Sequence, residues 1–537
     1  MNLPVNPMTW FLAILPILVL LVLMVKLQMG AMKAAPIGLL VSACSALLVY
    51  RASLPHVGME LLKGVWSALP ILIVVWTAIL LYEVVNQAKA FQVFRKSMGS
   101  LTRNELLQIM LLAWVFSSFL QGITGFGVPV AVGAPLLIGI GMKPFWAVVI
   151  PLLAHTWGNT YGTLGAAWDS LAIQAGMTEN AAMLSETAWW ATAFIWIWNF
   201  TAGLMLCWFY GKGKAVRKGL PAVLVISAIH GGGQMLVSQF NATLACFVPT
   251  VAAIGAIVAL GKSPLYRENW QVEDSPVMDR SARAGEETSA PENMSIVQAF
   301  LPYIVLTVLT LVILLVGPVK ALLGQVRLGF AFPSMETGYG YEDPASAKFS
   351  PIAIFTHAGF FLLVSAIFGY LYFSAKGWME EGSAAAIGRR TVKKTIPSTI
   401  SVICFIAMSK VMGGTGQTTV MARGIAGAMG EAYVALAPVV GLLGSFMTSS
   451  NMASNILFGS FQLETANFLG IDPCPVLGDQ TAGGAIGAAI CPGNIVLGCT
   501  TAGIVGKEGL VLRKVLPITL MAAAIVGLIM YIACILL

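Results

Sequence analysis

Two polar runs, the first of them glycine-containing, interrupt otherwise apolar stretches of this 537-residue sequence. The first is Ser118–Phe126, which is followed by Gly127 and Pro129. The second is Ser445–Ala453, and it contains the run Thr448-Ser449-Ser450-Asn451. Both runs are predicted to break a helix and to leave backbone N–H and C=O groups unpaired, the first because glycine and proline disfavour a continuous helix and the second through its run of four small polar residues. Inside a membrane, such backbone persists only where protein buries it or where it lines a wet cavity.

The chemistry expected at these breaks is the binding of a small anion. The N-terminus of a half-helix presents free N–H groups and the positive end of the helix dipole, and both suit a carboxylate. Small residues also permit close helix packing, but two related polar breaks in corresponding places favour a binding site over packing alone. The substrate-binding residues predicted in the two runs are Gly122, Thr124, Gly125, Phe126, Gly127, Ser449, Asn451, Ser454 and Asn455.

Lys410 is a further predicted substrate-binding residue, because it lies inside an apolar stretch just before Gly413-Gly414-Thr415-Gly416. A charge within a spanning helix costs about 3 kcal/mol on insertion scales and therefore indicates function. The alternative is a snorkelling lysine, or one paired structurally with Glu431 or Asp479. His155 follows the first run closely and is a candidate proton relay, although a hydrogen-bonded structural histidine explains it as well. The other ionisable residues within apolar stretches are His230, His357, Arg423, Glu431, Glu464 and Asp479.

The composition predicts that these residues are held by membrane-spanning helices. The chain is 58% hydrophobic and only 10% charged, whereas a soluble domain carries roughly 25% charged residues. Long apolar stretches recur from end to end, and a spanning helix needs about 20 mostly apolar residues. The sequence therefore predicts an all-α polytopic membrane protein with about 12 to 14 transmembrane helices. The eight cysteines form no CxxC pair and are interpreted as packing thiols.

Basic residues cluster in short loops between the apolar stretches, which accounts for the net charge of +7 without nucleic-acid binding. Assigning every cluster to the cytoplasm places both termini outside a multi-pass inner (plasma) membrane protein. The clusters are Lys26 and Lys33; Lys89, Arg95, Lys96 and Arg103; Lys212, Lys214, Arg217 and Lys218; Arg389, Arg390, Lys393 and Lys394; and Arg513 and Lys514.

The two runs also predict how the chain is divided. Each follows an apolar helix, precedes another apolar piece, and is closed by a glycine-rich segment, Gly158–Ala167 or Ala482–Gly503. This pattern indicates two inverted repeats, each containing a broken or re-entrant helix hairpin. The expected divisions are an N-terminal half with the first repeat (1–260), a cytoplasmic linker (261–298) and a C-terminal half with the second repeat (299–537).

The sequence resembles the lactate permease family. Ser118–Ala131 is similar to its signature, in which a Ser-Phe pair precedes a Gly-Phe-Gly-x-Pro-Val-Ala run, and residues 448–459 match its second motif. Ala482-Gly483-Gly484 and Cys491-Pro492 fall where the family has Ala-Gly-Gly and Ser-Pro elements. The resemblance implies a symporter that imports L-lactate, D-lactate or glycolate with protons. Similarity to the wider ion transporter superfamily implies paired hairpins and an elevator-like movement.

Three positions depart from the family pattern: Gln121 stands where Glu is usual, Asn451 where Asp is usual, and Ala488 where a Lys is expected. An amide cannot titrate, so two plausible proton carriers are missing. Gln121 and His155 are the residues assigned to coupling, and the coupling ion is left open between H⁺ and Na⁺. A sodium-coupled carrier of a different organic anion, such as a dicarboxylate or a sulfonate, is the alternative.

The sequence does not predict an enzyme. It has no HExxH, no GxSxG and no GxxxxGK[ST] motif, so the common metalloprotease, hydrolase and phosphate-cradling arrangements are not indicated. A passive channel would need a continuous polar pore, whereas two interrupted helices favour a gated site. No catalytic residue, metal site or cofactor is predicted beyond the coupling ion. The expected partners are a small organic anion and the lipid bilayer, with a homodimer as a further expectation.

Overall fold

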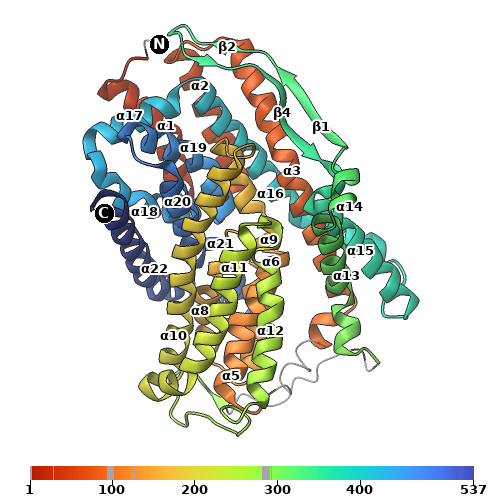
Figure 1. Cartoon of the computed structure of the whole chain (residues 1–537). Helices are drawn as coiled ribbons and strands as arrows, with labels where there is room; N and C mark the ends of the chain where they lie inside the picture. Colours follow the sequence, from red (N-terminus) through yellow and green to blue (C-terminus); the bar gives the residue numbers. More distant parts are fainter. Residues whose placement is uncertain are drawn as a thin grey trace.

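Twelve helical segments in the described residues are long and apolar enough to cross a membrane, which confirms the expected polytopic helical architecture. The structure is a computed structural model that describes residues 3–27, 29–93, 102–125, 127–280, 291 and 293–536. Figure 1 shows the helices running roughly side by side, with a small group of strands at one end of the molecule.

The elements are bounded as follows. The helices of the first half are α1 (Pro7–Leu21), α2 (Ala31–Leu48), α3 (Leu54–Gln87), α5 (Glu105–Ile109), α6 (Ser117–Ile123), α7 (Val128–Gly139), α8 (Pro144–Ala154), α9 (Gly162–Gln174), α10 (Ala181–Ser227), α11 (Gly233–Ser238) and α12 (Phe247–Lys262). Those of the second half are α13 (Ile296–Leu315), α14 (Gly317–Leu323), α15 (Ala358–Ala375), α16 (Ser383–Gly414), α17 (Gln417–Met429), α18 (Ala437–Thr448), α19 (Asn451–Leu469), α20 (Pro473–Gly487), α21 (Pro492–Thr501) and α22 (Glu508–Tyr531). The strands are β1 (Arg327–Phe332), β2 (Met335–Glu336), β3 (Glu342–Asp343) and β4 (Ser346–Ala353).

The first polar run forms the turn of a helical hairpin, here called hairpin 1. Its first arm is α5 and α6, which a π-helical segment at Met110–Phe116 joins, and its second arm is α7. The arms are antiparallel and close, because a Cβ added to Gly133 of α7 would lie 2.7 Å from Ser117 Oγ of α6. A π-helical insertion inside a long helix frequently marks a functional region.

The second polar run forms the turn of hairpin 2, whose arms are α18 and α19. Gly444 lets these arms approach, since an added Cβ would lie 2.3 Å from Ser454 Oγ. Gly441 and Gly483 do the same between α18 and α20, where added Cβ atoms would lie 2.1 Å from the Gln480 carbonyl oxygen and 2.0 Å from that of Pro438. These glycines therefore have the packing role that small residues have between membrane helices.

The two hairpins open toward opposite faces of the protein. Both ends of hairpin 1 bond to the segment 263–280: Glu105 N–H donates to the Trp270 carbonyl (3.0 Å), and Lys143 N–H, just after α7, donates to that of Val277 (2.9 Å). The segment 263–280 defines the loop face. α19 leads instead to Asp472, whose carboxylate lies within 4.8 Å of that of Glu186 at the far end of α10. Hairpins that enter from opposite faces are the arrangement expected of inverted repeats.

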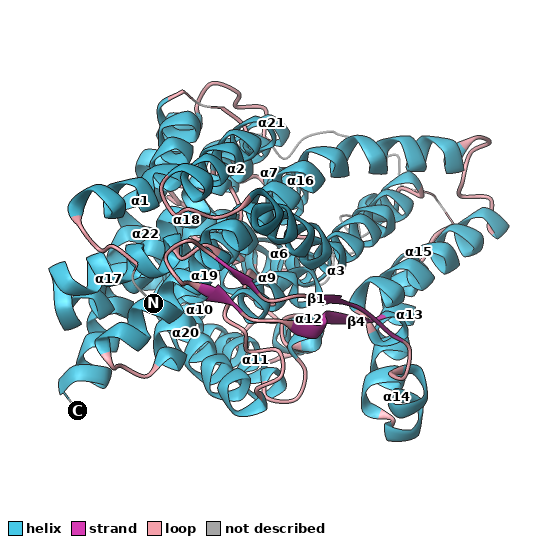
Figure 2. Ribbon diagram, turned by 90° about the horizontal axis from the view of Figure 1, so that it is seen from above, coloured by secondary structure: helices cyan, strands magenta, loops and turns pink. Residues whose placement is uncertain are grey.

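The strands lie on the face opposite the loop face, here called the strand face, which is at the top of Figure 1 and is seen from above in Figure 2. β1 pairs with β4 antiparallel, with Arg327 opposite Ala353, and β2 pairs with β3. They cover the end of α3, where Trp66 Nε1 donates to the Phe349 carbonyl (2.9 Å). The expectation of an all-helical chain is therefore correct for the membrane-spanning part, and the strands are a small addition outside it.

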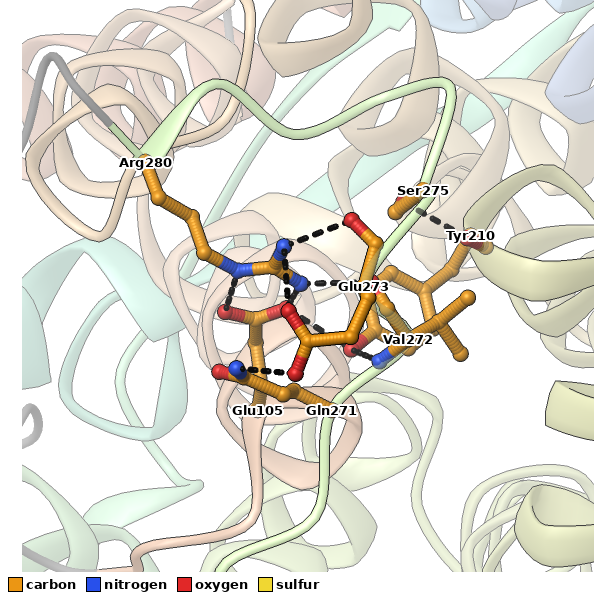
Figure 3. A network of polar contacts seen from close by, with 7 residues as sticks. All are labelled: Glu105, Tyr210, Gln271, Val272, Glu273, Ser275 and Arg280. Atoms are coloured by element: carbon orange, nitrogen blue, oxygen red, sulfur yellow. Dashed lines mark hydrogen bonds and ion pairs between the residues drawn. The ribbon is translucent and has the colours of Figure 1, made fainter.

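On the loop face, Arg280 and Glu105 form a two-pronged ion pair (Figure 3). Arg280 Nη2 lies 2.7 Å from Glu105 Oε1, and its Nε donates to Oε2 at 3.1 Å. Tyr210 of α10 donates its hydroxyl to Glu105 Oε1 (2.7 Å), and Arg280 Nη2 donates to the Val272 carbonyl (2.6 Å). The bond to the Glu105 carboxylate raises the pKa of the Arg280 guanidinium. The pair anchors the open end of hairpin 1 to α10 and the loop.

The segment that anchors hairpin 1 is part of the predicted linker, residues 261–298. Residues 263–280 pack against hairpin 1 and α10, whereas residues 281–290 and 292 lie outside the described part of the chain. The division into two halves and a linker stays a prediction.

Replacing Arg280 with Ala is expected to destabilise the protein, because it leaves the Glu105 carboxylate buried without its cation. Removing one partner of a buried ion pair costs about 3 kcal/mol. The measurement is the melting temperature in detergent, which should fall. Arg267→Ala, an exposed arginine in the same loop, is the matched control. Combining Arg280→Ala with Glu105→Gln should recover part of the loss, and no recovery would contradict the ion-pair account.

Candidate functional site

Each hairpin turns through backbone in the left-handed region. In hairpin 1 the turn contains Gly125 (φ 57°) and Gly127 (φ 78°), where glycine adopts the conformation without steric cost. In hairpin 2 the corresponding position is Ser449 (φ 58°), a residue for which this conformation is strained. Ser450 then caps α19 by accepting the N–H of Ala453 (3.3 Å). The two polar runs are thus true interruptions, as the sequence predicts.

Two further interruptions lie in the helices that follow the hairpins. Residues 155–161 separate α8 from α9 and are here called break 1; residues 488–491 separate α20 from α21 and are called break 2. After break 1, Thr163 and Leu164 also adopt left-handed backbone, with φ of 50° and 51°. Each repeat therefore contributes one hairpin turn and one broken helix.

These four interruptions border one narrow cavity of about 50 Å³. On this measure a cavity needs about 10–15 Å³ to hold one water molecule, so the space admits a few water-sized groups. Its lining is largely polar and uncharged: among the described residues, no side chain that lines it is ionisable. The polar side chains of the lining are Gln121, Asn159, Thr163, Ser449, Ser450, Asn451 and Asn494.

Three helices begin at this cavity. Gly127 is the N-cap of α7, Ser450 is the N-cap of α19, and Asn494 lies in the first turn of α21; all three residues line the space. The first turn of a helix has N–H groups without intrahelical partners and carries a partial positive charge. Three such ends around an uncharged cavity favour a bound anion, a carboxylate in particular.

Hydrogen bonds connect the hairpin turns to the broken helices. Gln121 Nε2 donates to Asn159 Oδ1 (2.9 Å), which links hairpin 1 to break 1. Asn451 Nδ2 donates to Thr160 Oγ1 (3.3 Å), and the hydroxyl groups of Thr160 and Thr481 lie 3.0 Å apart. Hairpin 2, break 1 and α20 therefore meet through one buried network, so a shift of any of them changes the shape of the cavity.

The structure brings four of the sequence-predicted residues to the cavity lining: Gln121, Gly127, Ser449 and Asn451. Gly125 lies in the turn beside them, where an added Cβ would be 2.3 Å from Thr163 Oγ1. The other residues expected from the two runs lie behind the lining, and Phe126 falls outside the described residues.

The residues behind the lining hold the turns in shape. Thr124 Oγ1 donates to the Leu120 carbonyl (2.9 Å) and Ser454 Oγ to that of Gly441 (2.7 Å). Asn455 Nδ2 donates to Thr481 Oγ1 (2.9 Å). Gly122 lies against α12, where an added Cβ would be 3.2 Å from Phe247 Cα. Direct binding roles for these residues stay predictions.

His155 lies at the C-terminal end of α8, where its Nδ1 is 2.5 Å from the Pro151 carbonyl oxygen. It is buried and belongs to break 1, but it is not part of the cavity lining. The contact is that of a histidine capping a helix end. Its assignment to coupling stays a prediction.

Lys410 lies apart from the cavity, on the strand face. Its Nζ is 5.5 Å from the centroid of the Phe349 ring of β4. It interacts electrostatically there with Glu60, Lys63 and Asp343, of which Lys63 forms ion pairs with both acids. The structure therefore places Lys410 in a group of two acids and two lysines beneath the strands and does not bring it to the residues of the two hairpin turns.

Four polar lining residues were not singled out from the sequence: Asn159, Thr163, Ser450 and Asn494. Asn159 and Asn494 have equivalent places, since one lies in break 1 and the other just after break 2. The available signal was the glycine-rich character of Gly158–Ala167 and Ala482–Gly503, which marked both regions as parts of the repeat but not these asparagines as lining residues.

Comparison with known proteins gives consistent matches over nearly the whole chain. An L-lactate permease of Halalkalibacterium halodurans is 26% identical over 516 residues, covering 94% of this chain and 93% of its own. An L-lactate permease of Salmonella typhimurium is 27% identical over 538 residues, covering 96% and 94%. The glycolate permease GlcA of Escherichia coli K12 is 26% identical over 553 residues, with the same coverage.

Similarity to solved structures is weaker. The Alcanivorax borkumensis YdaH transporter, a protein of unusual topology, aligns over 86% of this chain and 84% of its own with 14% identity and a TM-score of 0.42. The family model described as L-lactate permease, by contrast, matches residues 9–537. With that match and the two hairpin turns in place, the chain belongs to the L-lactate permease family.

Proposed function

We propose that this protein is a secondary active transporter that imports a small monocarboxylate, such as L-lactate, D-lactate or glycolate, together with protons. The observation that carries the proposal is the convergence of three helix N-termini on one uncharged cavity between two hairpins. The relatives described as L-lactate and glycolate permeases support the same substrate class.

The small size of the cavity favours a short substrate. Asparagine and serine side chains around it offer donors and acceptors for a hydroxyl group beside the carboxylate. Because the hairpins enter from opposite faces, separating one hairpin at a time from the broken helices would open the site to one face at a time. That movement is the alternating access that a symporter needs.

Sodium coupling with a different organic anion is the second candidate, and one observation favours it. Asn451 Oδ1 and Ser445 Oγ are buried without a hydrogen-bond partner, and both lie beside Gly484. A Cβ added to Gly484 would be 2.0 Å from Asn451 Oδ1 and 3.3 Å from Ser445 Oγ. Amide and hydroxyl oxygens are ligands suited to a hard cation.

We infer the orientation in the membrane from the position of the basic residues. We place the loop face in the cytoplasm and both termini outside the plasma (inner) membrane, because Lys212, Lys214 and Arg217 lie beside the loop segment at Val272 and Asp274. A homodimer stays an expectation.

Counterflow in proteoliposomes tests the proposed function. Vesicles loaded with unlabelled L-lactate should take up labelled L-lactate saturably, and an imposed inward proton gradient should drive accumulation, whereas a sodium gradient should not. Glycolate and D-lactate should compete, whereas a dicarboxylate or a sulfonate should not. Protein-free vesicles are the control. Accumulation driven by sodium, or competition by the dicarboxylate, would select the second candidate.

Gly127→Ala should reduce transport about tenfold or more. The left-handed backbone at this position costs an alanine about 1–2 kcal/mol, and about 1.4 kcal/mol corresponds to a tenfold effect. The added Cβ would also lie 2.8 Å from Leu497 Cδ2 and 3.0 Å from Asn494 Oδ1. Gly413→Ala, where an added Cβ meets nothing within 4 Å, is the matched control and should transport normally. Normal uptake by Gly127→Ala would exclude this turn from the site.

Gln121→Glu should make uptake depend more steeply on pH. Gln121 lines the cavity, and a carboxylate there would repel an anionic substrate when ionised but not when protonated. Uptake by this variant should therefore fall as pH rises through the titration of the new group, and the measurement is the pH profile of initial rates. Gln325→Glu, at an exposed position, is the control. A profile identical to that of the unaltered protein would show that position 121 does not face the substrate.

A further inference from the structure

The buried acidic residues of this protein differ in whether a basic side chain is paired with them. Within the described part of the chain, four acidic side chains are buried: Glu60, Glu83, Glu105 and Asp479. Glu60 is paired with Lys63, Glu83 with Arg390 and Lys394, and Glu105 with Arg280. Asp479 has no ion pair in this part of the chain, and both of its carboxyl oxygens are buried without a hydrogen-bond partner.

Asp479 lies on α20, in the helix that connects hairpin 2 to the cavity. The residues beside it contact separate elements: Gly478 packs against Trp190 of α10, and Gln480 Nε2 donates to Ser454 Oγ of α19 (3.1 Å). Two residues on, Thr481 bonds to Thr160 of break 1. α20 then leads into break 2, whose Ala488 lines the cavity. A change in the protonation of Asp479 that moves α20 would therefore also change the cavity.

The groups around Asp479 do not supply a counter-charge. The titratable side chains that interact with it electrostatically are Tyr433, in the turn before α18, and Cys534, after α22. Of the elements packed against α20, α18 and the turn at 156–158 carry no ionisable side chain.

Several charged groups lie on the other helices packed against α20. Glu464 of α19 interacts with Arg423, and Glu186 of α10 lies beside a second acid, Asp472, at the start of α20. Lys514 of α22 lies over the ring of Trp146, 5.5 Å from its centroid. The ionisable side chains of α9 and α22 that remain are Asp169, Glu508, Arg513 and Tyr531.

We propose that Asp479 is the proton-binding residue of the transport cycle. A buried carboxyl group is tolerated when it is neutral, but a carboxylate without a cation or hydrogen bonds is strongly disfavoured there. The arrangement described here thus requires a proton on Asp479. Loss of that proton favours a conformation in which α20 exposes the group to water, so proton binding and the position of α20 are linked.

This inference rests on the proposed function and gives it a site for the coupling ion. The carboxylate of Asp479 takes up a proton from the side of high proton concentration and releases it on the other side. The carrier with a protonated Asp479 and one bound monocarboxylate has the same net charge as the empty carrier with an ionised Asp479. One transport cycle would therefore move no net charge across the membrane. The uncharged cavity is consistent with this separation, since the proton and the anion then occupy different places.

Asp479→Asn tests the inference, because an amide has nearly the same shape but binds no proton. In proteoliposomes, accumulation of labelled L-lactate driven by a proton gradient should fall about tenfold or more. Counterflow without a gradient should continue, since it needs only the cavity and the movement. The dependence of the initial rate on pH should flatten, and Asp479→Glu should restore part of the accumulation.

Asp472→Asn is the matched control. Asp472 is exposed and caps α20 by accepting the Cys474 N–H (2.9 Å), which an asparagine also does. This variant should accumulate lactate like the unaltered protein.

The outcomes separate the two proposals. If the unaltered protein shows neither counterflow nor accumulation of lactate or glycolate, the proposed function fails. If the unaltered protein accumulates lactate and Asp479→Asn does so equally, with the same pH profile, Asp479 is not the proton site. Loss of both counterflow and accumulation in Asp479→Asn, with Asp472→Asn normal, would also overturn the inference, since the residue would then be needed for the fold or for binding.

Discussion

The architecture depends on the need to satisfy backbone polar groups deep inside a membrane protein. The hairpin turns at Gly125–Gly127 and Ser449–Ser450 interrupt helices, and their free N–H and C=O groups cannot face lipid. The structure resolves this by placing the two turns beside each other and beside breaks 1 and 2, so that the interruptions share one small polar space. The proposed anion site follows from this arrangement, because two helices begin where the hairpin turns end and a third begins after break 2.

Charge is used differently in the outer and inner parts of the protein. The ion pairs Lys63–Glu60, Arg390–Glu83 and Arg280–Glu105 fix helices and loops to one another. The described lining of the cavity, by contrast, contains amides, hydroxyls, helix ends and a few small or apolar residues, and no ionisable side chain. Fixed opposite charges would bind an anion tightly and slow its release, whereas partial charges of helix ends provide a weaker attraction. This division suits a site that must load and unload in every cycle.

The sequence predicted much of the fold and four of the thirteen residues that line the cavity. The polar runs marked the two hairpin turns because glycine and proline in the first run, and hydroxyl and amide side chains in the second, act locally; Gln121, Gly127, Ser449 and Asn451 followed from them. Asn159 and Asn494 could not be singled out, since their position depends on how two separate broken helices meet the turns. Lys410 illustrates the same limit. The sequence showed that it lies inside an apolar stretch, but its neighbours Glu60, Lys63 and Asp343 come from distant segments and could not be predicted.

The departures from the family pattern and the position of Asp479 have a common explanation. Gln121 and Asn451, where the resemblance leads to the expectation of acids, are amides that donate hydrogen bonds to Asn159 and Thr160. Uncharged side chains at these positions leave the partial positive charge of the helix ends unopposed, which favours an anion. A proton-binding carboxyl group is still needed if protons drive uptake, and it must lie where it does not repel the substrate. A buried position on α20, outside the lining, meets both requirements; α20 is connected to the lining residue Asn451 through the hydrogen bonds of Thr481 and Thr160.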